Sequence, residues 1–156
     1  MKTTEKIIIE PFRLIGISVK TTNENGQSAE DIGQLWNKFM SEGIMEKIPN
    51  KIENSILSVY TNYEGDHTQP YTTILGCKVS SLENIPEGMV GQSFNGGVYT
   101  GFVSKGDLTK GVVYDTWSEI WKKNLDRVFT ADFEIYDEKA QNPADAEVDI
   151  LVAVQG

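Results

Sequence analysis

The chain is poor in the residue types on which many small catalytic and metal sites depend. Its 156 residues include one cysteine, Cys77, and one histidine, His67. One cysteine cannot form an intramolecular disulfide, and one histidine cannot build a multi-histidine metal site. We expect Cys77, in a predicted strand, to be a buried structural thiol, and His67 to be a solvated loop residue. The sequence therefore predicts no metal and no cofactor.

Positive charge is also scarce. The chain has 14 lysines and arginines against 23 acidic residues, which gives a net charge of −9. The basic residues are scattered, and the densest pair, Lys122 and Lys123, falls late in a predicted helix, where it complements the helix dipole. Because phosphate recognition needs clustered basic side chains, we expect no direct nucleic-acid binding.

Long apolar runs are missing as well. The N-terminal run Ile7–Ile9 is far shorter than the roughly 20 apolar residues that cross a membrane, and it is also too short for a signal peptide. The glycine-rich stretch 91–101 carries neither a P-loop nor a dinucleotide fingerprint. We expect a cytoplasmic protein that forms one domain over residues 1–156 and has no membrane partner.

Strand and helix patterns alternate along the chain. Apolar and alternating segments predict strands at 7–9, 14–19, 56–60, 71–79, 97–103, 129–136 and 147–154. Two amphipathic helices are expected, the first capped by Ser28. Their apolar stripes are Ile32, Leu35, Trp36, Phe39 and Met40, and then Val113, Trp117, Ile120, Trp121 and Leu125. On these stripes we expect the three tryptophans to pack in the core.

The two halves repeat the same order of elements. The second helix follows the first at an offset of 81 (Trp36 to Trp117), and the strands after it follow at an offset of 76 (Tyr60 to Tyr136, Leu75 to Leu151). One offset for two successive strands is what a duplication would produce, although any two such units share periodicity.

We therefore predict two β-α-β-β repeats, at about 6–80 and 96–155, joined by a linker at about 81–95. The fold class is α+β. The units form a curved, largely antiparallel sheet with two helices on one side and a ligand groove between the halves.

Glu134 is the residue that stands out chemically. Its strand alternates, so Phe133 faces one side of the sheet while Glu134 and Tyr136 face the other. If the helices cover the Phe133 side, Glu134 faces the groove beside an aromatic ring. A carboxylate among tyrosines suits a cationic, aromatic ligand, or acts as a general base if burial raises its pKa. The alternative is a solvated glutamate on an open sheet face.

The order of several short motifs resembles the GyrI-like family, the AraC-type effector-binding domains of bacterial transcription activators. The motifs are Gly97-Val98-Tyr99, Trp117-Ser118-Glu119-Ile120, Phe133-Glu134-Ile135-Tyr136, Glu147-Val148-Asp149-Ile150 and the linker segment Pro86-Glu87-Gly88-Met89. The resemblance implies a pocket that senses drugs or metabolites, with Glu134 as its central acidic residue. Family members often follow a DNA-binding helix-turn-helix. The first strand predicted here starts near residue 6, so we expect a stand-alone member.

Three functions follow for such a domain. The first is binding of a small hydrophobic, cationic organic molecule, with a link to transcription regulation. Glu134 would supply the charge, and the aromatic walls would be Tyr60, Tyr71, Tyr99, Trp117 and Tyr136. The second is hydrolysis of a strained or electrophilic small molecule with Glu134 as general base, as the resemblance implies for some stand-alone relatives. The third is a protein-binding module that acts on DNA gyrase.

Overall fold

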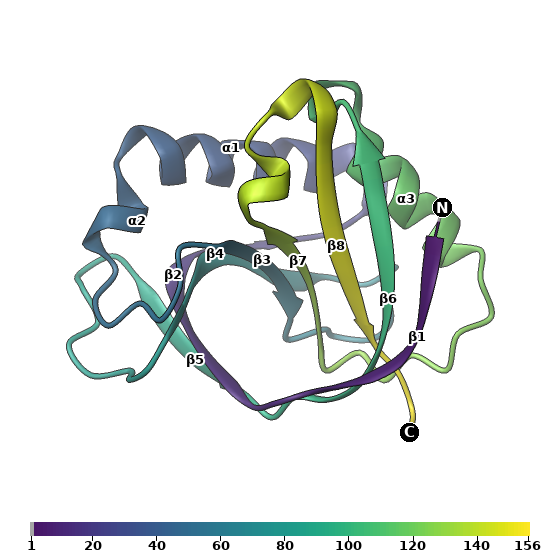
Figure 1. Ribbon diagram of the computed structural model, residues 1–156, viewed down its shortest axis with the longest axis horizontal. Coiled ribbons are helices and arrows are strands. Elements are labelled where there is room, and N and C mark those ends of the chain that lie inside the picture. Colours follow the sequence, from purple (N-terminus) through teal and green to yellow (C-terminus); the bar gives the residue numbers. More distant parts are fainter. Residues whose placement is uncertain (1) are drawn as a thin grey trace.

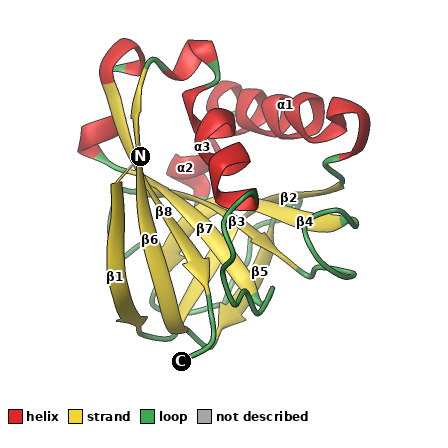
Figure 2. Cartoon of the chain, turned by 90° about the vertical axis from the view of Figure 1, so that its right-hand side faces the viewer, coloured by secondary structure: helices red, strands yellow, loops and turns green. Residues whose placement is uncertain are grey.

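The computed structural model describes residues 2–156, with side chains from Lys6 onward. Over that range the backbone forms one eight-stranded sheet that curls strongly, with the helices gathered above it (Figures 1 and 2). The strands are β1 (Lys2–Ile9), β2 (Phe12–Thr21), β3 (Ile56–Thr61), β4 (Tyr71–Val79), β5 (Val90–Phe94), β6 (Gly97–Gly106), β7 (Ala131–Tyr136) and β8 (Ala146–Ala153). The helices are α1 (Gln27–Ser41), α2 (Ile44–Lys47) and α3 (Val112–Trp121).

The sheet order is internally symmetric. It runs β1-β6-β8-β7-β3-β4-β2-β5, and each pair of neighbouring strands is antiparallel. Read outward from the central β3–β7 pair, the order is β3-β4-β2-β5 on one side and β7-β8-β6-β1 on the other, so equivalent strands of the two repeats occupy equivalent places. The predicted duplicated α+β sheet with both long helices on one side is therefore confirmed. Each outermost strand pairs with the opposite half, since β1 pairs with β6 and β5 with β2.

Three local predictions were wrong. The stretch expected to be a linker contains β5, whose five residues pair with β2. The first helix does not start on a Ser28 cap. It begins at Gln27 after Gly26, which has a left-handed backbone with φ of 69°, and Ser28 lies buried inside the first turn. Met40, placed on the apolar stripe, is 64% exposed.

The register between the halves corrects one offset. Ser58 pairs with Leu75 across β3 and β4, and its counterpart Glu134 pairs with Ile150 across β7 and β8. Leu75 thus corresponds to Ile150, an offset of 75 rather than the 76 that Leu151 requires. A one-residue shift moves a strand's side chains to the other face, so this register decides which residues meet the helices.

Both faces of the sheet are buried, which the strand pattern alone does not reveal. The inside of the curl is closed by its own side chains, including Phe12 stacked on Phe94 at 5.0 Å between ring centroids, with Phe133 packed against Phe12. The helices pack on the opposite face, where Phe39 and Ile120 are the central contacts of α1 and α3. The helices therefore cover the Glu134 face and not, as the sequence reading supposed, the Phe133 face.

None of the helices in residues 2–156 is long and apolar enough to cross a membrane.

Candidate functional site

A cavity of about 350 Å³ lies between α1 and α3, over the central strands β3 and β7. Its walls are mostly aromatic and aliphatic. They comprise Asn23, Ser28, Ala29, Ile32, Gly33, Trp36, Tyr60, Tyr63, His67, Tyr71, Leu108, Val113, Tyr114, Trp117, Trp121, Arg127, Glu134 and Tyr136. This size falls within the range of small-molecule pockets, and a few polar groups in an apolar lining are typical of them. The groove thus lies between the halves as expected, but on the helix side.

Glu134 lies at the base of this cavity and is only 2% exposed. Three neutral donors hold its carboxylate. Tyr60 donates its hydroxyl to Oε2 at 2.7 Å, Trp117 donates its indole N–H to the same oxygen at 2.7 Å, and Tyr136 donates to Oε1 at 2.6 Å. The alternative of a solvated glutamate on an open sheet is therefore wrong.

Two opposing effects set the ionisation of Glu134. Burial raises the pKa of its carboxyl, and the hydrogen bonds from Tyr136, Tyr60 and Trp117 lower the pKa by stabilising the charged form. Burial dominates, so the pKa lies above its ordinary value. The pKa of Tyr60 and of Tyr136 is raised too, by burial first and then by the Glu134 charge, so both phenols keep their protons and remain donors.

The symmetry of the sheet explains how one carboxylate meets two tyrosines. Ser58 and Glu134 face each other directly in the β3–β7 register, so the pseudo-twofold axis passes between them. Tyr60 and Tyr136 lie on equivalent positions two residues away, and both reach the same carboxylate. The tryptophans follow the same rule: Trp117 packs edge-on against Tyr60 at 5.7 Å, and Trp36 against Tyr136 at 4.8 Å.

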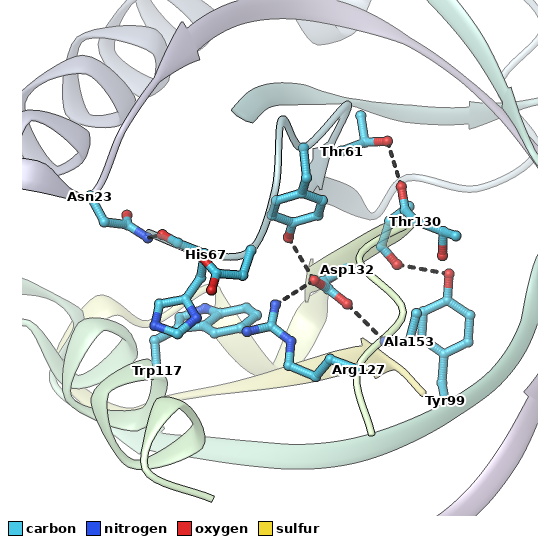
Figure 3. Close-up of polar contacts among 12 residues, drawn as sticks. Asn23, Thr61, His67, Tyr99, Trp117, Arg127, Thr130, Asp132 and Ala153 are labelled. Atoms are coloured by element: carbon cyan, nitrogen blue, oxygen red, sulfur yellow. Dashed lines mark hydrogen bonds and ion pairs between the residues drawn. The ribbon is translucent and has the colours of Figure 1, made fainter. Parts of the chain in front are cut away.

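A second polar cluster lies beside the first (Figure 3). The Nη2 of Arg127 forms an ion pair with Oδ2 of Asp132 at 2.7 Å. Tyr63 donates to the same oxygen at 2.6 Å, and the backbone N–H of Ala153 donates to Oδ1 at 2.8 Å. The guanidinium also lies over the Phe129 ring at 4.3 Å.

His67 is not the solvated residue that the sequence led us to expect. It is half-buried and lines the cavity, and its ring stacks on Trp121 with 5.1 Å between centroids and an angle of 6°. Its backbone carbonyl accepts a hydrogen bond from Asn23, which fixes the loop. Burial lowers the pKa of His67, and the nearby Arg127 charge lowers it further.

Of the predicted wall residues, Tyr60, Tyr71, Trp117 and Tyr136 line the cavity with Glu134. Tyr71 donates to Asn23 Oδ1 at 2.6 Å and packs edge-on against Tyr60.

Tyr99 lies elsewhere. It belongs to the core inside the curl, with its hydroxyl donating to the carbonyl of Ala131, because the pleat of β6 turns it away from the helices. Cys77 is buried as predicted, and burial raises its pKa to about 11.

Four residues that line the cavity were not predicted from the sequence as site residues: Trp36, Tyr63, Trp121 and Arg127. The two tryptophans had a usable signal, since they lie on amphipathic stripes next to the predicted groove. Tyr63 and Arg127 lie in irregular segments that carry no periodicity. No cluster of three or more metal-binding side chains occurs among residues that the structure describes.

Comparison with known proteins identifies the family of the chain. A family model described as Cass2, integron-associated effector binding protein, matches residues 7–154. "Putative transcriptional regulator protein YobU" of Bacillus subtilis (strain 168) is 32% identical over 151 residues, which cover 92% of each chain.

Two solved structures are similar over nearly the whole chain. The integron cassette protein VCH_CASS2, from the mobile metagenome of Vibrio cholerae, is 30% identical with a TM-score of 0.74, and the match covers 97% of this chain and 95% of that one. The protein SAV2435, solved bound to tetraphenylphosphonium, has a TM-score of 0.79 at 17% identity, covering 100% and 95% of the two chains, so this likeness is one of fold. By its family match and its relatives, the chain belongs to the integron-associated effector-binding proteins, within the GyrI-like effector-binding domains.

Proposed function

We propose that this effector-binding domain takes a hydrophobic organic cation into the cavity between α1 and α3. Glu134 supplies the negative charge. Tyr60, Tyr136 and Trp117 supply aromatic surface around it. The observation that carries the proposal is a buried carboxylate whose three partners are all neutral.

The charge balance favours a cation. Arg127 is the one lysine or arginine of the described cavity lining, and it is already paired with Asp132, so an ionised Glu134 leaves the pocket with one uncompensated negative charge. No ion pair to Glu134 occurs within residues 6–156. Burying an unpaired charge is costly, so a ligand that brings the opposite charge removes that cost on binding.

The aromatic walls of the cavity also favour a cationic ligand. Cations are attracted to the faces of tyrosine and tryptophan rings. Tyr60 and Tyr136 hold Glu134 through neutral hydroxyl groups, which do not cancel the charge of the carboxylate. Their rings line the cavity, where a ligand can contact them. A diffuse organic cation fits this pocket better than a small inorganic ion, whose hydration the apolar lining cannot replace.

The comparisons support this proposal through a relative of the same fold. SAV2435 was solved with tetraphenylphosphonium, which is a hydrophobic organic cation. The name of YobU links a homologue to transcription regulation. We propose that ligand binding here serves a similar regulatory purpose, as an effector signal passed to a protein partner, with no direct contact to nucleic acid.

The test is a titration with tetraphenylphosphonium, followed by calorimetry, of the wild type and Glu134→Gln. At roughly 7 Å and an effective dielectric constant of about 20, the charge contributes about 2 kcal/mol, so affinity should fall about thirtyfold. Glu119→Gln, on the exposed side of α3, makes the same change in net charge and should bind like the wild type. Equal affinities for all three proteins would refute the role of Glu134.

The same samples test the hydrolase alternative. Mass spectrometry of candidate strained or electrophilic substrates, after incubation with wild type and with Glu134→Gln, would reveal turnover. Product that forms with wild type and not with the variant would make the chain an enzyme. Unchanged compounds are the result that a binding protein predicts.

A further inference from the structure

The guanidinium of Arg127 has hydrogen-bonding capacity that the protein does not use. Only Nη2 is engaged, with Asp132, while Nε and Nη1 are buried and have no hydrogen-bond partner among the described residues. The side chain is 8% exposed, so this is a buried cation with unsatisfied donors. Such donors are costly to leave unpaired, and more so when charged. The position therefore needs an acceptor that the folded chain does not itself provide.

The side chain that carries these donors borders the cavity that already contains Glu134. The two donor atoms have almost no accessible surface of their own, so a ligand reaches them as a neighbouring side chain moves aside. Arg127 is one of the lining residues. Figure 3 shows its guanidinium between Asp132 on one side and the rings of His67 and Trp117 on the other. The Trp117 ring lies 5.9 Å from the guanidinium carbon, and the same tryptophan donates to Glu134. One side chain thus connects the two polar groups of the pocket.

We propose that Arg127 forms a second subsite, which donates a hydrogen bond to an uncharged oxygen acceptor of the ligand, such as a ketone, amide or ester carbonyl. This inference rests on the proposed function, because it describes the other end of the same ligand. The preferred ligand is then an organic cation that also carries a carbonyl oxygen. An uncharged acceptor is favoured over a carboxylate, because Glu134 and Asp132 already place two negative charges near this position.

The Asp132 contacts hold this donor in place. Asp132 has no exposed side-chain surface and accepts from Tyr63 and Ala153 as well as from Arg127. The guanidinium is therefore fixed on one edge by Asp132, and Phe129 covers one of its faces. A donor fixed in this way loses little conformational freedom when an acceptor arrives, which favours specificity.

A matched pair of ligands tests the subsite directly. (4-Acetylphenyl)trimethylammonium and (4-isopropylphenyl)trimethylammonium have the same charge and nearly the same shape, but only the first has an acceptor oxygen. The meta isomers of both compounds test a second distance between the ammonium group and the acetyl oxygen. For at least one isomer we expect the wild type to bind the acetyl compound about tenfold more tightly, as one hydrogen bond to a charged donor would give. Equal affinities for both pairs would overturn the proposal.

Two variants and one spectroscopic readout separate this subsite from the rest of the pocket. The double substitution Arg127→Met with Asp132→Asn removes the ion pair as a unit, and Arg127→Lys keeps its charge. Both should lose most of the acetyl preference while still binding the isopropyl compound. The infrared carbonyl band of a ¹³C-labelled acetyl ligand should move to lower frequency on binding to wild type. An unshifted band would contradict the proposal even if both variants failed to fold.

Failure of the Arg127 subsite can be told apart from failure of the proposed function. If Glu134→Gln leaves the binding of the isopropyl cation unchanged, the proposed function fails. If Glu134→Gln weakens both cations equally but the wild type shows no acetyl preference, only the Arg127 subsite fails.

Discussion

Removing one hydroxyl beneath the pocket should change the pH at which the protein binds cations. Tyr60 donates to Glu134 at 2.7 Å in a buried site, and a hydrogen bond to a charged group contributes about 1.5–3 kcal/mol. The bond stabilises the carboxylate, so Tyr60→Phe disfavours the charged form. At about 1.4 kcal/mol per pKa unit, the pKa of Glu134, already raised by burial, should rise by a further one unit or more.

The assay is the affinity for tetraphenylphosphonium between about pH 4 and pH 9. Its charge does not titrate, so the profile reports the ionisation of the groups that line the cavity, which include Glu134 and His67. Binding weakens as the pH falls through the pKa of Glu134, and the comparison of wild type with a tyrosine variant isolates that step, since His67 is common to both proteins. In Tyr60→Phe the midpoint should move to higher pH, and Tyr136→Phe should act similarly, since its bond to Glu134 is equivalent. Tyr71→Phe is the control, because that hydroxyl donates to Asn23. An unmoved midpoint in Tyr60→Phe, or an equal movement in Tyr71→Phe, would show that the Tyr60 hydroxyl does not control the ionisation of Glu134.

Further predictions concern stability. Because burial raises the pKa of Glu134, the folded state holds that proton more tightly than the unfolded state. The free energy of unfolding should therefore fall as the pH rises from the ordinary glutamate pKa through the raised value. Urea unfolding of Glu134→Gln should lack this pH dependence. A Cβ at Gly16 would overlap the backbone of Leu75, so Gly16→Ala should lower the free energy of unfolding by about 2 kcal/mol or more. A Cβ at Gly33 in α1 meets open space, so Gly33→Ala should raise the free energy of unfolding by up to about 1 kcal/mol. Thermal unfolding measures both changes. Tyr99→Phe removes a buried hydrogen bond and should cost about 1 kcal/mol in the same measurement, yet leave cation affinity unchanged; a weakened affinity would place Tyr99 in the site after all.

The repeat and the fold class could be predicted because they rest on periodicity. The spacing of Trp36 and Trp117 and the alternation around Tyr60 and Tyr136 survive in the structure as equivalent positions. The alternation of β7 also assigned Glu134 and Tyr136 to one face correctly. These are local properties, and strand and helix geometry fix them without reference to the rest of the chain.

The side on which the helices pack could not be predicted in the same way. Alternation says which residues share a face, but here the curl of the sheet buries the Phe133 face as thoroughly as the helices bury the Glu134 face. Tyr99 was misplaced for this reason: an aromatic residue on a strand fits either interior.

Arg127 and His67 lie in irregular segments, where position depends on long-range contacts. Arg127 is fixed by its ion pair with Asp132, and His67 by its stacking on Trp121. Neither contact leaves a pattern in the sequence. The second polar group of the pocket therefore became visible only in three dimensions, unlike Glu134, whose strand alternation pointed to it.

We propose that Glu134 recognises the charge of the ligand and not merely its shape. A thermodynamic cycle measures this most directly, with phenyltrimethylammonium and its uncharged isostere tert-butylbenzene titrated by NMR into wild type and Glu134→Gln. We expect the wild type to prefer the cation, and the variant to lose about tenfold or more of this preference while binding tert-butylbenzene as before. A preference for the cation that is the same in both proteins would contradict this proposal.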